Sequence, residues 1–148
     1  MRAVVQRARD AKCEVNGEIT GAFDGSGLVV LVGVTHADTL QSAQKMAHKI
    51  AKQRIFAAPE AVRGTEMSAL DLELPVLLIS QFTLYGDTRK GNRPSWVAAA
   101  PGDVAKPLVE AVACELESLG MRVETGIFGA NMQVSFTNDG PFTVLIEI

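Results

Sequence analysis

Apolar and polar positions along the N-terminal part of the chain follow the pattern of β-strands. On this basis strands are predicted at three short stretches, residues 2–9, 12–15 and 18–23. Asn16-Gly17 predicts a tight hairpin turn, because both central positions of such a turn need positive φ. A second turn is expected at Gly25-Ser26-Gly27. Residues 28–34 are almost entirely apolar, which predicts a strand buried on both faces.

Two later segments carry apolar residues at helical spacing. The first helix is expected at about 38–54, with Asp38 or Thr39 as its N-cap. Its apolar face comprises Leu40, Ala43, Ala47, Ile50 and Ala51. The second helix is expected at 103–119. Gly120 would end it, because glycine accepts the left-handed conformation that follows many helices.

The remaining predicted strands are short. Residues 76–80 predict a buried strand, and residues 57–74 show no clear period and are expected to be irregular. Closing strands are expected at 121–127, 131–137 and 142–148. Because many strands accompany only two helices, we predict an α+β fold. It would be a single domain over residues 1–148, of mainly antiparallel strands in barrel-like layers, with two principal helices on one side.

Composition narrows the class of protein without giving a function. The chain has 148 residues, of which 47% are hydrophobic and 21% are charged, and this is typical of one globular domain. No apolar stretch approaches the roughly 20 residues of a membrane span, so a cytoplasmic location is expected. Cys13 and Cys114 lie far apart without a neighbouring His, so neither a zinc site nor a disulfide scaffold is expected. The formal charge of −3 means that any nucleic-acid contact must be local.

Standard sets of catalytic residues are absent from the sequence. Neither His36 nor His48 has an acid or a nucleophile at a telling spacing. There is no nucleophile elbow, no zinc-protease motif and no phosphate-binding glycine loop. Pattern and composition alone therefore predict a globular α+β domain and leave its chemistry open.

One candidate site is the end of the buried strand at 76–80. The motif Ser80-Gln81-Phe82-Thr83-Leu84 places two hydroxyls and an amide there, where a long polar segment (81–101) begins. Compact domains rarely keep so long a loop without a function, and such a strand end can form a polar pocket. The alternative is that Ser80 and Thr83 merely bond to nearby backbone, which is common for these residue types.

A second candidate is the segment 138–143, Asn-Asp-Gly-Pro-Phe-Thr. Its residues are typical of a turn, and one interpretation is a turn that links the last two strands. Gly140-Pro141 is also a place where a cis peptide bond can occur. A cis bond would point neighbouring carbonyl groups the same way and form a rigid backbone wall.

A third feature is a row of lysines on the first predicted helix. Lys45, Lys49 and Lys52 share one face because they are spaced at i, i+4 and i+7. A solvated helix face is the simpler interpretation, since charge pattern alone is weak evidence. The alternative is a surface that binds RNA phosphates.

The motifs at 80–84 and 138–143 together resemble those of the D-aminoacyl-tRNA deacylase family, in the family's order and near its spacing. The resemblance covers essentially the whole chain. Further matching segments are Gln6-Arg7, Arg54-Ile55-Phe56, Asp87-Thr88, Gly91-Asn92-Arg93-Pro94-Ser95, Ala99-Ala100-Pro101, Thr125-Gly126, Phe128, Ala130 and Met132-Gln133-Val134.

The resemblance implies a homodimeric hydrolase with its active sites at the subunit interface. It would cut the ester between a D-amino acid, or more weakly glycine, and the 3′ end of tRNA, without a metal or organic cofactor. In the family the Gly-Pro pair is cis and enters the partner's active site. Gly140 and Pro141 are therefore expected to face the catalytic residues of a second copy, where an L side chain would collide with them. Those catalytic residues are Ser80, Gln81, Phe82 and Thr83.

The same resemblance suggests roles for other residues. Arg7 would brace the Gly-Pro segment, because a guanidinium can bind several carbonyl groups. Phe82 and Phe142 would flank the terminal adenine, and Met132 would belong to the substrate-binding set. Thr83 is expected to orient water with the help of the tRNA's 2′-hydroxyl and not to attack, because no base accompanies it. Backbone N–H groups near Gln81 and Phe82 are the candidate oxyanion donors.

Contacts to tRNA phosphates would come from basic residues at two places in the sequence. These residues are Lys45, Lys49, Lys52, Arg89, Lys90 and Arg93.

The chain departs from the family's pattern at a few positions, and other functions stay open. Residues 67–70 and 72–75 differ from the usual Met-Asn-Leu and Gly-rich segments, and Trp96 replaces the more usual Phe. A related family that removes L-alanine carries Pro-Gln-Ala-Thr-Leu at the first motif, so Ser80 and Phe82 favour the D-specific side. The alternatives are that relative, a small-ester esterase using Ser80 or Thr83, and a non-catalytic RNA-binding dimer.

Overall fold

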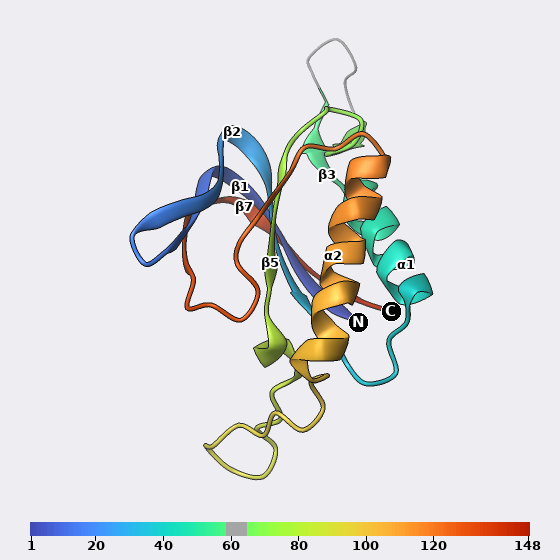
Figure 1. The fold of residues 1–148 in the computed structure, drawn as a ribbon. Helices are drawn as coiled ribbons and strands as arrows, with labels where there is room; N and C mark the ends of the chain where they lie inside the picture. Colours follow the sequence, from blue (N-terminus) through green and yellow to red (C-terminus); the bar gives the residue numbers. More distant parts are fainter. Residues whose placement is uncertain (59–64) are drawn as a thin grey trace.

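A five-stranded mixed sheet with the order β6-β5-β2-β1-β7 forms the centre of the computed structural model, which describes residues 1–58 and 65–148 (Figure 1). The three long strands pair antiparallel, whereas β5 lies parallel to β2 and β6 lies parallel to β5. The strands of this sheet are β1 (Arg2–Val15), β2 (Glu18–Gly33), β5 (Val76–Ser80), β6 (Val123–Thr125) and β7 (Gln133–Glu147). The predicted α+β fold of mainly antiparallel strands is confirmed.

Two helices, α1 (Leu40–Ala51) and α2 (Gly102–Ser118), cover one face of the sheet, as predicted (Figure 1). Thr39 caps α1 in a reciprocal pair with Ser42, in which each side-chain oxygen accepts the other residue's backbone N–H. After α2, Gly120 adopts φ +92° and its N–H donates to the carbonyl of Glu117. Both predicted helix ends at these residues are confirmed. Helix α1 stops at Ala51, however, earlier than predicted.

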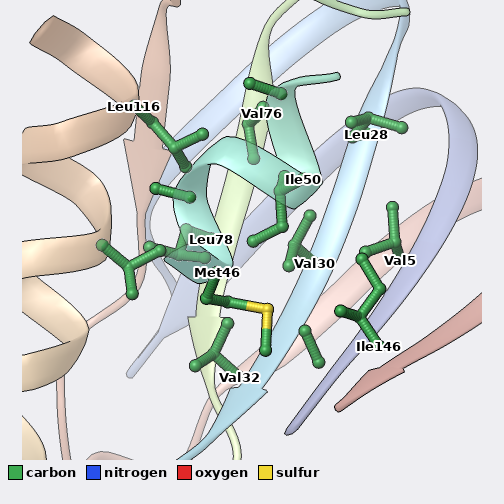
Figure 2. Packing of buried hydrophobic residues seen from close by; sticks show 14 of the residues in the cluster. Val5, Leu28, Val30, Val32, Met46, Ile50, Val76, Leu78, Leu116 and Ile146 are labelled. Atoms are coloured by element: carbon green, nitrogen blue, oxygen red, sulfur yellow. The ribbon is translucent and has the colours of Figure 1, made fainter. Parts of the chain in front are cut away.

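The main core lies between the sheet and the two helices (Figure 2). Alternate residues of β2 and β5 face the helices, and the residues between them belong to a second buried cluster on the opposite face. The residues facing the helices include Leu28, Val30, Val32, Val76 and Leu78, and those facing away include Val29, Leu77 and Ile79. This two-sided burial explains why residues 28–33 of β2 and 76–79 of β5 are continuous apolar runs.

Strands β1 and β2 are longer than predicted. The hairpin at Asn16-Gly17 is confirmed, with φ of 52° and 84°. The predicted turn at Gly25-Ser26-Gly27 and the predicted break before residue 12 are wrong. A bulge replaces both: Asp10 and Gly25 take positive φ, and the Gly25 N–H donates to Asp10 Oδ1 at 2.7 Å. Glycine and a short acidic residue therefore kink the ladder here without ending it.

The segment expected to be irregular at 57–74 contains regular structure. Strand β3 (Arg54–Ala57) pairs with β4 (Glu66–Ser68) in a separate two-stranded sheet. The Arg54 side chain supports this pair by donating from Nε to the carbonyl of Glu66 at 2.9 Å. Strands this short carry too few residues to show a period, so no pattern of apolar positions predicts them. The part of the prediction at 59–64 lies outside the described residues.

The predicted turn between the two last strands is also wrong, because both belong to β7. The pairing of β7 with β1 jumps from Gln6↔Thr143 to Ala8↔Asn138, so residues 139–142 lie opposite the single residue Arg7. Turn-forming residues thus form a bulge within a strand at the edge of the sheet. The Gly140–Pro141 peptide bond is cis.

Candidate active site

A pocket of about 600 Å³ opens where the parallel strands β2 and β5 end. Ser80, Gln81 and Phe82 form one wall, and Met132 lines another. Three of the four predicted catalytic residues therefore line one pocket. Met132, which was predicted to bind substrate, lines the same pocket. The lining is mostly apolar with a few polar groups, which is typical of a ligand site.

The wall at Ser80–Phe82 is built by a sharp turn after β5. The Gln81 N–H donates to the carbonyl of Val32 at 2.7 Å, which extends the parallel ladder by one bond. The chain then enters a short 3-10 helix, η2 (Phe82–Tyr85). Gly33 on β2 allows this close approach, because a Cβ there would lie only 2.9 Å from the carbonyl oxygen of Gln81.

The turn determines which of the backbone N–H groups of Gln81 and Phe82 remains available as a hydrogen-bond donor. The Gln81 N–H is already bonded to Val32, so it is not free to bind an oxyanion. Phe82 is the first residue of η2, so its N–H has no partner inside that helix, and within the described residues it donates to no other backbone carbonyl. Phe82 is therefore the better backbone candidate of the two.

Thr83 lies beside the pocket and does not line it. Its hydroxyl accepts a hydrogen bond from the Gln81 side-chain amide, and its carbonyl accepts the Gly86 N–H at 2.9 Å. Among the described contacts of Thr83, none is to a basic side chain that could activate the hydroxyl. This arrangement fits an orienting role better than that of a nucleophile.

Several pocket residues were not predicted from the sequence. Trp96, Phe128 and Gly102, the first residue of α2, all line the pocket. They lie far from residue 80 in the sequence, and only the fold brings them together. The aromatic residues at 96 and 128 within loop segments were the one available signal, since exposed aromatic residues in loops often bind ligands.

Arg7 and the Gly-Pro segment form a separate cluster on β1 and β7, and none of its members lines this pocket. The Arg7 guanidinium donates to the carbonyls of Asp139 (2.9 Å), Gly140 (2.5 Å) and Ile55 (2.9 Å). It also lies over the ring of Phe142, 5.0 Å from the centroid. Arg7 therefore braces this segment, as predicted. One face of the Phe142 ring is already occupied by Arg7.

The basic residues divide into two groups. Lys45 and Lys49 are exposed on α1 and Lys52 is exposed at its C-cap, and none of the three lines the pocket. Arg89, Lys90 and Arg93 lie in the loop that leads from η2 to Trp96. Both carboxylate oxygens of Asp87 accept hydrogen bonds from Arg89, which lowers the pKa of Asp87 to about 2. Asp87 is thus ionised throughout the physiological range.

Within residues 1–58 and 65–148, no group of three or more His, Cys, Asp or Glu is arranged to hold a metal ion. The same residues contain no helix long and apolar enough to span a membrane. His48 is paired with Glu115 across α1 and α2, 3.0 Å apart, away from the pocket.

The fold and the pocket define a small α+β protein with a pocket at the ends of two parallel strands. Comparison with known proteins identifies it further: residues 4–147 match the family described as D-Tyr-tRNA(Tyr) deacylase, and the chain belongs to this family. The D-aminoacyl-tRNA deacylase of Streptomyces coelicolor is 58% identical over 148 residues and that of Thermobifida fusca 55%, with all of each chain covered. The resemblance noted in the sequence is therefore confirmed.

Solved structures show the same fold. The c-Myc DNA unwinding element binding protein matches with a TM-score of 0.89 and 36% identity, over 100% of this chain and 99% of its own. A probable eukaryotic D-amino acid tRNA deacylase matches with a TM-score of 0.86 over 99% and 98% of the two chains. At 19% identity, the second likeness shows the fold alone.

Proposed function

We propose that this protein is a D-aminoacyl-tRNA deacylase that hydrolyses the ester between a D-amino acid, or more weakly glycine, and the 3′ end of tRNA. The observation that carries the proposal is the pocket lined by Ser80, Gln81 and Phe82 in a chain that belongs to the deacylase family. Relatives that are 58% and 55% identical over the full chain carry this activity in their names.

The active enzyme would be a homodimer with composite sites. In one chain, Gly140 and Pro141 do not line the pocket that holds Ser80 and Phe82. Both are exposed on β7, which is an edge strand with Leu145 62% exposed. An unpaired edge strand with apolar side chains favours association with a second copy. Gly140 and Pro141 of that copy would then complete the pocket.

Selection between D and L esters would rest on exclusion by backbone. Arg7 binds the carbonyls of Asp139 and Gly140, so this segment is held in one geometry. A rigid wall beside the α-carbon rejects the wrong stereoisomer by collision, without any contact that favours a particular side chain. Editing of this kind is useful where a synthetase cannot discriminate well enough by binding.

Hydrolysis would need an oriented water and a donor for the developing oxyanion. The Phe82 N–H is the candidate donor. Thr83, hydrogen-bonded to the Gln81 amide, would orient the water together with the substrate's 2′-hydroxyl. Met132 and the rings of Phe82 and Phe142 would contact the substrate. The basic residues on α1 and in the loop after η2 would contact tRNA phosphates.

The test is release of amino acid from D-tyrosyl-tRNA and L-tyrosyl-tRNA by the purified protein, with a chelator present. The proposal expects fast loss of the D-ester only. Equal loss of both esters would overturn the exclusion mechanism and favour a general esterase. Binding of tRNA without loss of either ester would favour a non-catalytic RNA-binding dimer. Loss of L-alanine from its tRNA would place the chain with the L-alanine-removing relatives.

A further inference from the structure

The segment between η2 and α2 extends beyond the end of the sheet (Figure 1), and its residues Trp96, Ala99 and Ala100 line the pocket. Its two arms are joined at Asp87 and Ser95, whose N–H and carbonyl groups form two mutual hydrogen bonds of 2.9 Å. Residues 88–94 therefore form a closed loop with a fixed base. We call residues 86–98 the rim.

Two aromatic side chains stand where the rim meets the pocket. Phe82 and Trp96 both line the pocket, yet 56% of Phe82 and 41% of Trp96 are exposed. Their ring centroids lie 5.4 Å apart in an edge-to-face arrangement. Exposed flat rings of this kind at a pocket mouth are suited to stacking against unpaired bases.

Neighbouring backbone and side chains fix the aromatic wall in place. Trp96 packs against Gly86, where a Cβ would lie 2.6 Å from the indole ring. The loop before α1 holds the next residues of the rim: the Thr35 hydroxyl donates to the carbonyl of Ala98 at 2.6 Å, and His36 Nε2 lies 2.9 Å from the carbonyl of Val97. The aromatic surface is therefore preorganised, which lowers the entropic cost of binding.

The rim is positively charged, although the whole chain has a formal charge of −3. Arg89, Lys90 and Arg93 are exposed, and Asp87 is the single carboxylate in the segment. Asp87 is bound by Arg89, whereas Lys90 and Arg93 form no ion pair with any residue in the described part of the chain. Two cations are thus free to meet an anionic partner beside the aromatic pair.

We propose that the rim, together with Phe82, binds the single-stranded RNA that leads into the pocket. One unpaired base would stack on the Phe82–Trp96 pair, and Lys90 and Arg93 would contact the flanking phosphates. Aromatic rings interleaved with cations are the physical basis of single-strand binding. This inference rests on the proposed function, and it assigns the entry of the tRNA end to the rim and not to the lysines of α1, which do not border the pocket.

Trp96 is the only tryptophan in the chain, so its fluorescence reports directly on the proposed surface. The probe is the trinucleotide CCA, compared with adenosine alone, each titrated into the wild-type protein at several salt concentrations. Stacking is expected to quench Trp96, and CCA is expected to bind roughly tenfold or more tightly than adenosine, because a further stacked base and phosphate contacts are added. The affinity for CCA should fall as salt rises.

Two double variants distinguish the contribution of the basic residues of the rim from that of the lysines of α1. Removing both Lys90 and Arg93 as Lys90→Ala and Arg93→Ala is expected to weaken CCA binding roughly tenfold and to reduce its salt dependence. The matched pair Lys45→Ala and Lys49→Ala removes the same charge from α1, whose proposed contacts are to tRNA phosphates outside the CCA end, so CCA binding should stay as in the wild type. Equal effects of the two pairs, or CCA binding no tighter than adenosine, would overturn the inference.

Activity measurements separate this inference from the proposed function. In the Lys90/Arg93 double variant, KM for D-tyrosyl-tRNA should rise more than KM for the D-tyrosyl ester of adenosine. If the wild type hydrolyses D-tyrosyl-tRNA but CCA does not quench Trp96, the inference fails and the function stands. If CCA quenches Trp96 but no ester is cut, the function fails and the RNA surface stands. A change of Trp96 emission with protein concentration, accompanied by loss of the quenching by CCA, would show that a second copy covers the rim, which overturns the inference.

Discussion

Arg7 on β1 donates through Nη2 to the carbonyl oxygen of Gly140 on β7 at a distance of 2.5 Å. The same guanidinium binds the carbonyls of Asp139 and Ile55, so one side chain ties together β1, β3 and the bulge in β7. The register of β7 explains the need for it. Residues 139–142 have no ladder partner on β1, and the carbonyls of Asp139 and Gly140 accept hydrogen bonds from the Arg7 side chain instead.

Replacing Arg7 by Lys should therefore disturb the Gly-Pro segment. A lysine carries one compact cation and cannot reproduce the planar fork that reaches three carbonyls. We expect kcat/KM on D-tyrosyl-tRNA to fall roughly 100-fold, because small misplacements of a binding wall have effects of this size. Arg9→Lys is the matched control, since Arg9 is an exposed arginine on the same strand. An Arg7→Lys enzyme with wild-type kinetics would contradict a bracing role in function.

Thr83→Ala tests whether the threonine attacks or orients. Loss of a true nucleophile reduces kcat by roughly 10⁴-fold or more, because the covalent route is closed. We expect a loss of less than about tenfold, since a hydroxyl that only orients water can be partly replaced by another water. Single-turnover hydrolysis of D-tyrosyl-tRNA measures the effect, with Thr83→Ser as the control. An acylated wild-type enzyme trapped by acid quench, and missing from Thr83→Ala, would establish nucleophilic attack instead.

Tyr85 should titrate well above an ordinary tyrosine. Burial disfavours its phenolate, and the nearby charge of Asp38 adds to this, so the pKa of Tyr85 rises from 10.0 to about 12. A folded-state pKa above the unfolded value means that the contribution to stability is present below about pH 10 and is lost between pH 10 and 12.

Tyr85 is the only tyrosine in the chain, so absorbance at 295 nm follows its ionisation directly. We expect a midpoint near 12 in the folded protein and a lower one in Asp38→Asn, provided that circular dichroism shows the variant folded. A midpoint at 10 before unfolding begins would show that the ring is not shielded as described.

Asp38 should matter for stability far more than a surface acid. Its Oδ1 lies 2.6 Å from the Met1 ammonium, and the two side chains are 5% and 0% exposed. Its Oδ2 accepts the N–H of Thr35 at 2.8 Å. Asp38→Asn would leave a buried ammonium without its counter-charge, which costs about 3–5 kcal/mol in the free energy of unfolding.

Urea unfolding measures this difference in the free energy of unfolding. Glu147→Gln is the matched control, because it removes one carboxylate from the exposed pair with Arg2. Exposed pairs contribute about 0–1 kcal/mol, so the control should unfold close to the wild type. Similar losses in the two variants would mean that the Met1–Asp38 pair is no more important than a surface contact.

The hydrophobic pattern by itself determined most of the elements of this protein. The apolar runs of β2 and β5, the two amphipathic helices, the Asn16-Gly17 hairpin and the stop at Gly120 depend on local spacing and on local φ preferences, which the sequence contains. The motifs at 80–84 and 138–143 were likewise visible as ordered strings, and they marked the family before any geometry was known.

Only the tertiary structure decided how these pieces are used. The residues of the bulges at Gly25 and at 139–142 are typical of turns. The strands nevertheless continue through both bulges, because β1 pairs with β2 and with β7 on either side of them. Trp96 and Phe128 join Ser80 in one pocket, and Arg7 meets Gly140 across the sheet, through contacts between residues distant in sequence. Local preference sets the conformation of each short segment, whereas a site forms from surfaces that meet only when the whole chain has packed.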